Sequence, residues 1–201
     1  MSNYGKLLNN LSTLKLFRIK DKLDEYIDLI NTNKKDVVDS LYELTNLEID
    51  VMNEKKIKHS IQFAGFPFYK TFADFDFSFQ PSINKDEILD FRNLRFIDKA
   101  ENILFVGSPG VGKTHLATAI GIENAKSNHS TYFTNCNDLI QSLKKAFLQN
   151  RLDDKLKTLS KYKLLIIDEV GYLPIDIEAA NMLFQLINKR YEKASTIITT
   201  N

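Results

Sequence analysis

A stretch of eight residues has the spacing of a phosphate-binding loop. The pattern G-x-x-x-x-G-K-[ST] is matched by Gly107-Ser108-Pro109-Gly110-Val111-Gly112-Lys113-Thr114, which follows an apolar run and precedes a helical stretch. The glycines allow backbone N–H groups to point at phosphate oxygens, and the helix that follows adds the positive end of its dipole. We expect Lys113 to reach the β- and γ-phosphates and Thr114 to ligate Mg²⁺. The sequence therefore predicts binding of a nucleoside triphosphate, ATP with Mg²⁺, rather than a glycine turn without a ligand.

Two consecutive carboxylates follow a second apolar run, 164–167. Another strand and helix lie between Lys113 and this run, which is the spacing of a strand whose aspartate faces the bound metal. We expect Asp168 to hold Mg²⁺ and Glu169 to orient and polarise the attacking water. A second acid at this place points to hydrolysis rather than to phosphoryl transfer onto a small molecule. The alternative is a strand that simply ends in solvated acids.

The last residue of the sequence, Asn201, ends a further apolar run. A polar side chain there can reach between the two motifs and position the water, although a terminal Asn can also be merely frayed. The candidate catalytic residues are therefore Glu169, Lys113 and Asn201, and the candidate metal ligands are Thr114 and Asp168.

From about Ile88 onward, strand patterns alternate with helix patterns. The predicted strands are 103–106, 131–134, 164–167 and 196–200, and the predicted helices are 114–125, 138–149 and 178–191. Continuous runs of β-branched residues between helices are typical of a parallel sheet that is covered on both faces. The predicted fold class is α/β, with a P-loop core over residues 88–201.

The residues before this core have a helical pattern. Apolar residues recur at spacings of three and four over 7–30 and again over 37–51. Two or three amphipathic helices are predicted, too few to bury their own apolar faces, so they are expected to dock on something else. We assign 1–62 to a helical N-terminal region and 63–87 to an aromatic-rich linker.

The linker contains Phe63, Phe66, Phe68, Tyr69, Phe72, Phe75, Phe77 and Phe79, interrupted by Gly65 and Pro67. The favoured interpretation is an extended segment that pins its rings onto the core of the next domain. A second is that one ring packs against a bound adenine. Stacking on single-stranded DNA ranks third, because Lys70 is the sole basic residue between Phe63 and Phe79.

The formal net charge of +1 gives no global attraction to nucleic acid, so any DNA contact must come from a local basic patch. Two candidate patches are Lys144, Lys145, Arg151, Lys155 and Lys157, and Lys55, Lys56, Lys58 and His59. Each is either a solvated face or a track for phosphates. The single cysteine, Cys136, excludes a disulfide framework, and no apolar run is long enough to span a membrane. A cytoplasmic protein without a membrane partner is predicted. His115 is expected to pack or to hydrogen-bond.

The motifs resemble those of the IstB family. The resemblance is carried by 107–117, by Ile166-Ile167-Asp168-Glu169-Val170-Gly171-Tyr172-Leu173-Pro174, by 181–191 and by the linker residues 75–83. It implies a DNA-binding AAA+ ATPase that assists the transposition of insertion sequences. Such a protein would assemble on DNA as an ATP-dependent homo-oligomer and recruit or activate a transposase, with the N-terminal helices in DNA and oligomer contacts. Because the family is related to DnaC-type helicase loaders, a replicative helicase is the alternative partner.

In one respect the sequence departs from this family. Members continue past the position of Asn201 with a fifth strand, an arginine finger and a lid. In the strand order 5-1-4-3-2, the sequence then leaves strand 103–106 as an open apolar edge, and a protomer lacks the finger that completes its neighbour's site. A module that binds ATP without hydrolysing it is therefore an alternative function. A P-loop kinase for small molecules is disfavoured by the paired acids.

Overall fold

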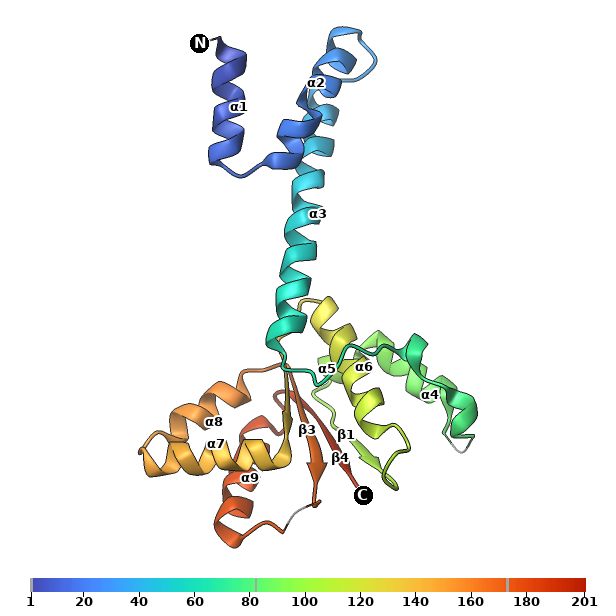
Figure 1. Cartoon of the computed structure of the whole chain (residues 1–201), viewed down its shortest axis with the longest axis vertical. Coiled ribbons are helices and arrows are strands. Elements are labelled where there is room, and N and C mark those ends of the chain that lie inside the picture. Colours follow the sequence, from blue (N-terminus) through green and yellow to red (C-terminus); the bar gives the residue numbers. More distant parts are fainter. Residues whose placement is uncertain (1, 82, 173) are drawn as a thin grey trace. The chain divides into compact units, whose positions relative to one another are not determined.

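The computed structural model describes residues 2–81, 83–172 and 174–201. The chain forms two compact units, Met1–Lys56 and Ile57–Asn201. Figure 1 shows helices alone in the first unit and a sheet with helices in the second. Among the described residues, no helix is long and apolar enough to cross a bilayer.

The first unit consists of α1 (Asn3–Thr13), α2 (Phe17–Asn31) and most of α3 (Val37–Phe63), whose last residues belong to the second unit. Ser2 caps α1 by accepting the Gly5 N–H at 3.2 Å. The start of α2 has no side-chain cap of its own. The buried Glu48 on α3 takes that role, because its carboxylate accepts the N–H groups of Arg18 and Ile19 at 2.6 and 3.1 Å.

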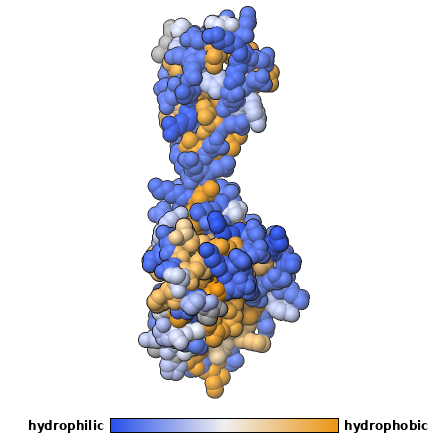
Figure 2. All heavy atoms as spheres, turned by 90° about the vertical axis from the view of Figure 1, so that its right-hand side faces the viewer, coloured by the Kyte–Doolittle hydropathy of each residue, from blue (hydrophilic) through white to orange (hydrophobic). Residues whose placement is uncertain are grey.

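Much of the apolar surface of this first unit stays exposed, as the predicted shortage of helices implies. Figure 2 shows hydrophobic patches between the polar residues of the helical unit. The large exposed side chains on its helices are Tyr4, Leu7, Phe17, Val37, Val38, Leu41, Tyr42, Ile49 and Met52. Among the described residues of this unit, the buried hydrophobic side chains are those of Leu11 and Leu44, so its interior is small.

The second unit is built on a parallel sheet of four strands: β1 (Ile103–Val106), β2 (Thr131–Asn135), β3 (Leu164–Val170) and β4 (Ser195–Thr200). Their order is β1-β4-β3-β2, and every pair of neighbouring strands is parallel. The predicted α/β fold with a parallel sheet is confirmed. The strand β1 lies at one edge of this sheet, where Leu104 and Val106 are exposed.

Helices cover the two faces of the sheet. One core contains α6 (Lys113–Lys126), where Leu116 and Ile120 pack against Leu164 and Ile166 of β3. The other contains α7 (Cys136–Leu148), α8 (Leu152–Ser160) and α9 (Ile177–Arg190), which pack against Leu165 and Ile167. Because side chains alternate along a strand, the continuous apolar run of β3 supplies both cores.

The helix α8 is held by an arginine that lies inside the protein. The Arg190 guanidinium donates to the carbonyl oxygens of Leu159 and Tyr162 at 2.9 Å and to the Thr196 hydroxyl at 3.0 Å. It also donates to the Ser195 carbonyl. Burial lowers the pKa of Arg190 to about 10. These contacts join the ends of α8 and α9 to the start of β4.

The segment between α3 and β1 contains short turns of helix: η1 (Phe72–Asp74), η2 (Phe77–Phe79), α4 (Lys85–Asp90), η3 (Phe91–Asn93) and α5 (Arg95–Asp98). Four linker rings, those of Phe66, Phe72, Phe75 and Phe77, pack on the core around α6. Phe63, Tyr69 and Phe79 are exposed. The favoured interpretation of the aromatic run, rings pinned onto the core, therefore holds for half of it.

Candidate functional site

The glycine-rich loop lies between the end of β1 and the start of α6, as its motif requires. Gly110 and Gly112 have φ angles of 82° and 93°, in the region that favours glycine. No side chain caps the start of α6, so its first N–H groups face the loop together with the positive end of the helix dipole. This geometry suits a phosphate group.

Gly112 also allows a linker ring to lie against the loop. A Cβ atom built there would lie 2.5 Å from Cε2 of Phe75, whereas a Cβ at Gly110 would meet nothing within 4 Å. The Phe75 ring also meets the His115 imidazole edge-on, with centroids 5.2 Å apart. The close approach of Phe75 therefore depends on the absence of a side chain at Gly112.

The two glycines give a matched pair of variants. We expect Gly112→Ala to lower the free energy of unfolding by more than Gly110→Ala does. Both changes place an alanine at positive φ, which costs roughly 1–2 kcal/mol, but Gly112→Ala also displaces Phe75. Urea denaturation of both variants measures the difference. Equal losses would show that Phe75 moves aside freely.

Lys113 is anchored at the centre of the loop. Its ammonium donates to the carbonyl oxygens of Gly107 and of Ser108, the latter at 2.9 Å, and to Oδ1 of Asn201 at 3.1 Å. Asn201 directly follows β4, which is the neighbour of β1 in the sheet. The structure thus brings together the predicted lysine and the predicted terminal asparagine.

Thr114 and Asp168 face each other across the site. The Thr114 hydroxyl lies 3.0 Å from both carboxylate oxygens of Asp168. A second hydroxyl, that of Thr199 on β4, donates to Oδ1 of Asp168 at 2.5 Å, and the carboxylate itself is buried. The role of Thr199 was missed, since a threonine in a β-branched run gives no signal beyond strand propensity.

The pairing of hydroxyl and carboxylate fits the predicted metal. Mg²⁺ prefers oxygen ligands, and in nucleotide sites one or two carboxylates suffice because phosphates and water complete the shell. Within 2–81, 83–172 and 174–201 there is no cluster of three metal-binding side chains, so no all-protein cage is described. Thr114 and Asp168 therefore fit a metal that arrives with a nucleotide.

Glu169 occupies an irregular place in β3. Pairing with β4 shifts register between Ile167 and Val170, and Glu169 has a φ of 59°, which is uncommon for a residue other than glycine. Its N–H donates to the Thr199 hydroxyl at 2.9 Å. Such strain clusters at functional sites, where surrounding contacts hold it. The bulge turns Glu169 away from the regular alternation of the strand.

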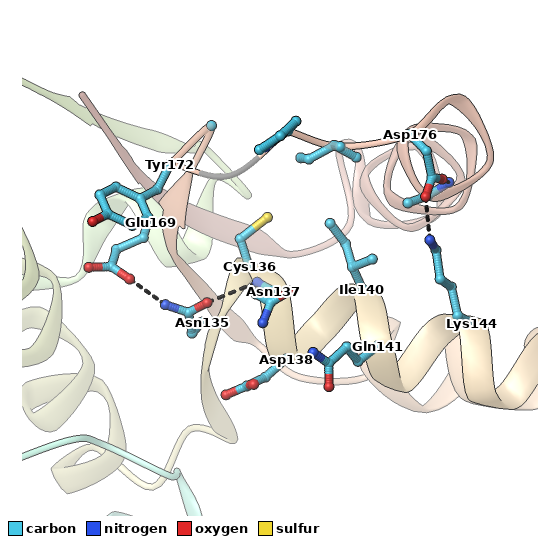
Figure 3. Close-up of a pocket in the computed structure, with 14 residues that line it drawn as sticks. Asn135, Cys136, Asn137, Asp138, Ile140, Gln141, Lys144, Glu169, Tyr172 and Asp176 are labelled. Carbon is cyan, nitrogen blue, oxygen red and sulfur yellow. Dashed lines mark hydrogen bonds and ion pairs between the residues drawn. The ribbon is translucent and has the colours of Figure 1, made fainter.

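The carboxylate of Glu169 has a partner on the neighbouring strand. The Asn135 side-chain amide, at the end of β2, donates to Glu169 Oε2 at 2.5 Å (Figure 3). Asn135 also caps α7 by accepting the Asn137 N–H at 2.9 Å. Asn135 is a further residue that was missed, although a polar residue directly after predicted strand 131–134 was an available signal.

Two hollows meet at Glu169. The first, of about 410 Å³, is lined by the loop and by Phe68, Lys70, Val170, Tyr172, Thr199, Thr200 and Asn201; we call it the P-loop cleft. The second, of about 450 Å³, lies between the start of α7 and the segment before α9 (Figure 3). Lys144 pairs with Asp176 at that pocket, and this contact, with the Ala179 N–H, lowers the pKa of Asp176.

The structure also gives positions for other residues that the sequence analysis singled out. His115 packs, with Nε2 2.9 Å from the Thr71 carbonyl oxygen. Lys145, Arg151 and Lys155 line one groove of about 310 Å³ between α7 and α8, whereas Lys144 is used in its ion pair. Two residues of the motifs that carried the family resemblance, Ser82 and Leu173, lie outside the described residues.

The parallel sheet, the glycine loop before α6 and the paired acids on β3 define an AAA+ type P-loop protein. The chain matches the family described as IstB-like ATP binding protein over residues 9–201, and it belongs to that family.

Similar proteins agree with this assignment. An ATP-binding protein of insertion sequence IS232 from Bacillus thuringiensis subsp. berliner is 53% identical over 200 residues, which cover 100% of this chain and 80% of that protein. The crystal structure of the DnaC helicase loader is 28% identical, with a TM-score of 0.55, and covers 69% of this chain and 77% of that chain. AMPPCP-bound DnaA from Aquifex aeolicus shares the fold at 20% identity and a TM-score of 0.58, over 67% of this chain and 43% of that chain.

Proposed function

We propose that the chain is a Mg²⁺-dependent ATPase that helps an insertion sequence to transpose, binding DNA and recruiting or activating a transposase. One observation carries the catalytic part of the proposal. The loop lysine, the Thr114–Asp168 pair and Glu169 lie around one cleft, with the residue types and positions that ATP hydrolysis needs. Family membership and the relative from insertion sequence IS232 support the transposition context.

Each residue in the cleft has a separate role in the proposed reaction. The loop N–H groups and Lys113 bind the phosphates, and Thr114 with Asp168 would hold the metal. Bound Mg²⁺ would neutralise charge on the phosphate oxygens. Glu169 accepts a proton from water as that water attacks the γ-phosphorus, and the bond to the β-phosphate oxygen breaks to give ADP and phosphate. Asn201, whose Oδ1 accepts a hydrogen bond from Lys113, would orient the water.

The test of the enzymatic part is phosphate release by the full chain with ATP, measured with and without DNA, and with Mg²⁺ or excess EDTA. We expect turnover that needs Mg²⁺ and rises when DNA is added. ATP binding without any turnover would favour the second candidate, a module that binds ATP but does not hydrolyse it.

The partner is tested separately, because the likeness to the DnaC helicase loader also supports a loader function. The tagged chain is incubated with ATP and either the transposase of a neighbouring gene or the replicative helicase of the same cell. Retention of the transposase alone supports the proposal, and retention of the helicase alone supports a loader. Mass measurement with and without ATP tests the proposed nucleotide-dependent homo-oligomer.

The groove between α7 and α8 is the proposed contact for DNA. Lys145, Arg151 and Lys155 line it, and no ion pair within the described part of the chain involves any of them. Cations that are free of carboxylate partners can neutralise phosphates.

Replacing Lys145, Arg151 and Lys155 together with alanine should weaken DNA binding for all sequences alike. Each lost phosphate contact should also reduce the slope of log affinity against log salt by about 0.9 for duplex DNA. Fluorescence anisotropy over a salt series measures both effects. The control is Lys193→Ala with Lys99→Ala, which removes charge elsewhere on the same unit. An unchanged salt slope in the triple variant would rule out this groove.

A further inference from the structure

The linker ring of Phe68 lies in a different place from its neighbours. Phe66, Phe72, Phe75 and Phe77 pack on the core around α6, whereas Phe68 lines the P-loop cleft together with Lys113 and Thr114. Its side chain is 36% exposed. A large apolar ring that opens onto a phosphate-binding cleft needs a different explanation from rings that fill a core.

Phe68 is held beside the loop by a residue of α6. Its ring meets the His115 imidazole edge-on, with centroids 6.3 Å apart and planes at 78°. His115 follows Thr114 directly and is itself fixed by the contact of Nε2 with the Thr71 carbonyl oxygen at 2.9 Å. The position of Phe68 relative to the loop is therefore set by His115, which is itself held by a residue three positions after Phe68.

The arrangement of the cleft decides which part of a nucleotide lies near Phe68. Lys113 is hydrogen-bonded to Asn201, and Thr114 is hydrogen-bonded to Asp168. The terminal phosphates and the metal therefore belong on the side of the cleft where these side chains lie. The remainder of the nucleotide must use the other lining residues. Two carbocyclic rings are among them, Phe68 and Tyr172, and Tyr172 lies in the segment that leaves Glu169. Of these two rings, Phe68 is thus the one that does not belong to the segment carrying the proposed catalytic Glu169.

We infer that Phe68 forms the wall on which the base of the bound nucleotide packs, an inference that rests on the proposed ATP site. Lys70, whose ammonium lies 5.3 Å from the Phe68 ring centroid, adds positive charge at the same wall. An aromatic wall recognises the flat face that every base presents and reads no hydrogen-bonding edge. The site therefore distinguishes a nucleotide from bare polyphosphate, and Phe68 contributes equally to ATP and GTP.

The test compares three ligands, ATP, GTP and inorganic tripolyphosphate, each with Mg²⁺, by calorimetric titration of the full chain. Phe68→Ala should weaken ATP and GTP by about 5- to 100-fold, the range that ring–base contacts span, and leave tripolyphosphate unchanged. Phe68→Tyr keeps the ring and should bind all three as the parent does. Tyr69→Ala is the matched control, since Tyr69 is adjacent and exposed but does not line the cleft.

Three results would overturn the inference: ATP affinity unchanged in Phe68→Ala, equal losses for ATP and tripolyphosphate, or a selective loss in Tyr172→Ala instead. A thermal melt of each variant shows whether it is folded. If Phe68→Ala is not folded, Phe68→Leu takes its place, because leucine removes the aromatic ring and keeps an apolar side chain. Lys113→Ala distinguishes a failure of the Phe68 assignment from a failure of the proposed ATP site. If that variant binds tripolyphosphate as well as the parent does, the proposed ATP site itself is wrong.

Discussion

ATP binding should be lost when Lys113 is replaced by alanine. The Lys113 ammonium lies at the centre of the loop, where it now contacts two loop carbonyl oxygens and Asn201. With ATP bound, it is expected to donate to the β- and γ-phosphates instead. A hydrogen bond to a charged group contributes about 1.5–3 kcal/mol, so two such contacts correspond to at least a 100-fold loss of affinity.

The measurement is titration with a fluorescent ATP analogue in the presence of Mg²⁺. Lys126→Ala is the matched control, because Lys126 is on the same helix but pairs with Glu123 at 2.9 Å and lies outside the P-loop cleft. The melting temperature of Lys113→Ala should stay close to that of the parent, since the half-buried Lys113 side chain belongs to neither hydrophobic core. Parental ATP affinity in Lys113→Ala would refute the phosphate assignment.

Turnover should fall by about 100- to 10,000-fold in Glu169→Gln while ATP binding persists, the range that general acid–base groups contribute. Glutamine keeps the shape of the side chain, and its carbonyl oxygen can still accept from the Asn135 amide. It cannot accept a proton from water at neutral pH. The change therefore removes the chemistry and preserves the contacts that position the side chain.

Steady-state phosphate release with saturating ATP, with and without DNA, measures the effect. Glu178→Gln serves as the control, because Glu178 is also an exposed acid but lies in the first turn of α9, away from the cleft. Turnover within about twofold of the parent in Glu169→Gln would show that Glu169 is not the group that accepts a proton from water.

The sequence predicted the elements whose signals are local. The strand 103–106 and the loop that follows it were recognisable because their motif is continuous in the chain. The helix α8 was not predicted, although Leu152, Leu156 and Leu159 have helical spacing, because its charged residues were interpreted as a surface stretch. Its position depends on Arg190, a residue far along the sequence whose burial no local pattern indicates.

The contacts of the candidate site were only partly predictable. The motifs predicted that Asp168 and Thr114 approach each other. The Thr114 hydroxyl lies 3.0 Å from Asp168 Oδ1. The hydrogen bonds that Thr199 and Asn135 make to the acids arise from strand order, which places β3 between β4 and β2. The positive φ of Glu169 depends on a register shift between strands and has no sequence signal.

The contact between Phe75 and Gly112 has a thermodynamic consequence. The ring occupies the space that a Cβ would need, so a movement of the linker ring changes the packing against the nucleotide loop. When two binding events share such an element, the factor by which one alters the other is the same in both directions. A protein or nucleic acid that displaces the linker ring would therefore change ATP affinity, and ATP would change the affinity for that partner by an equal factor.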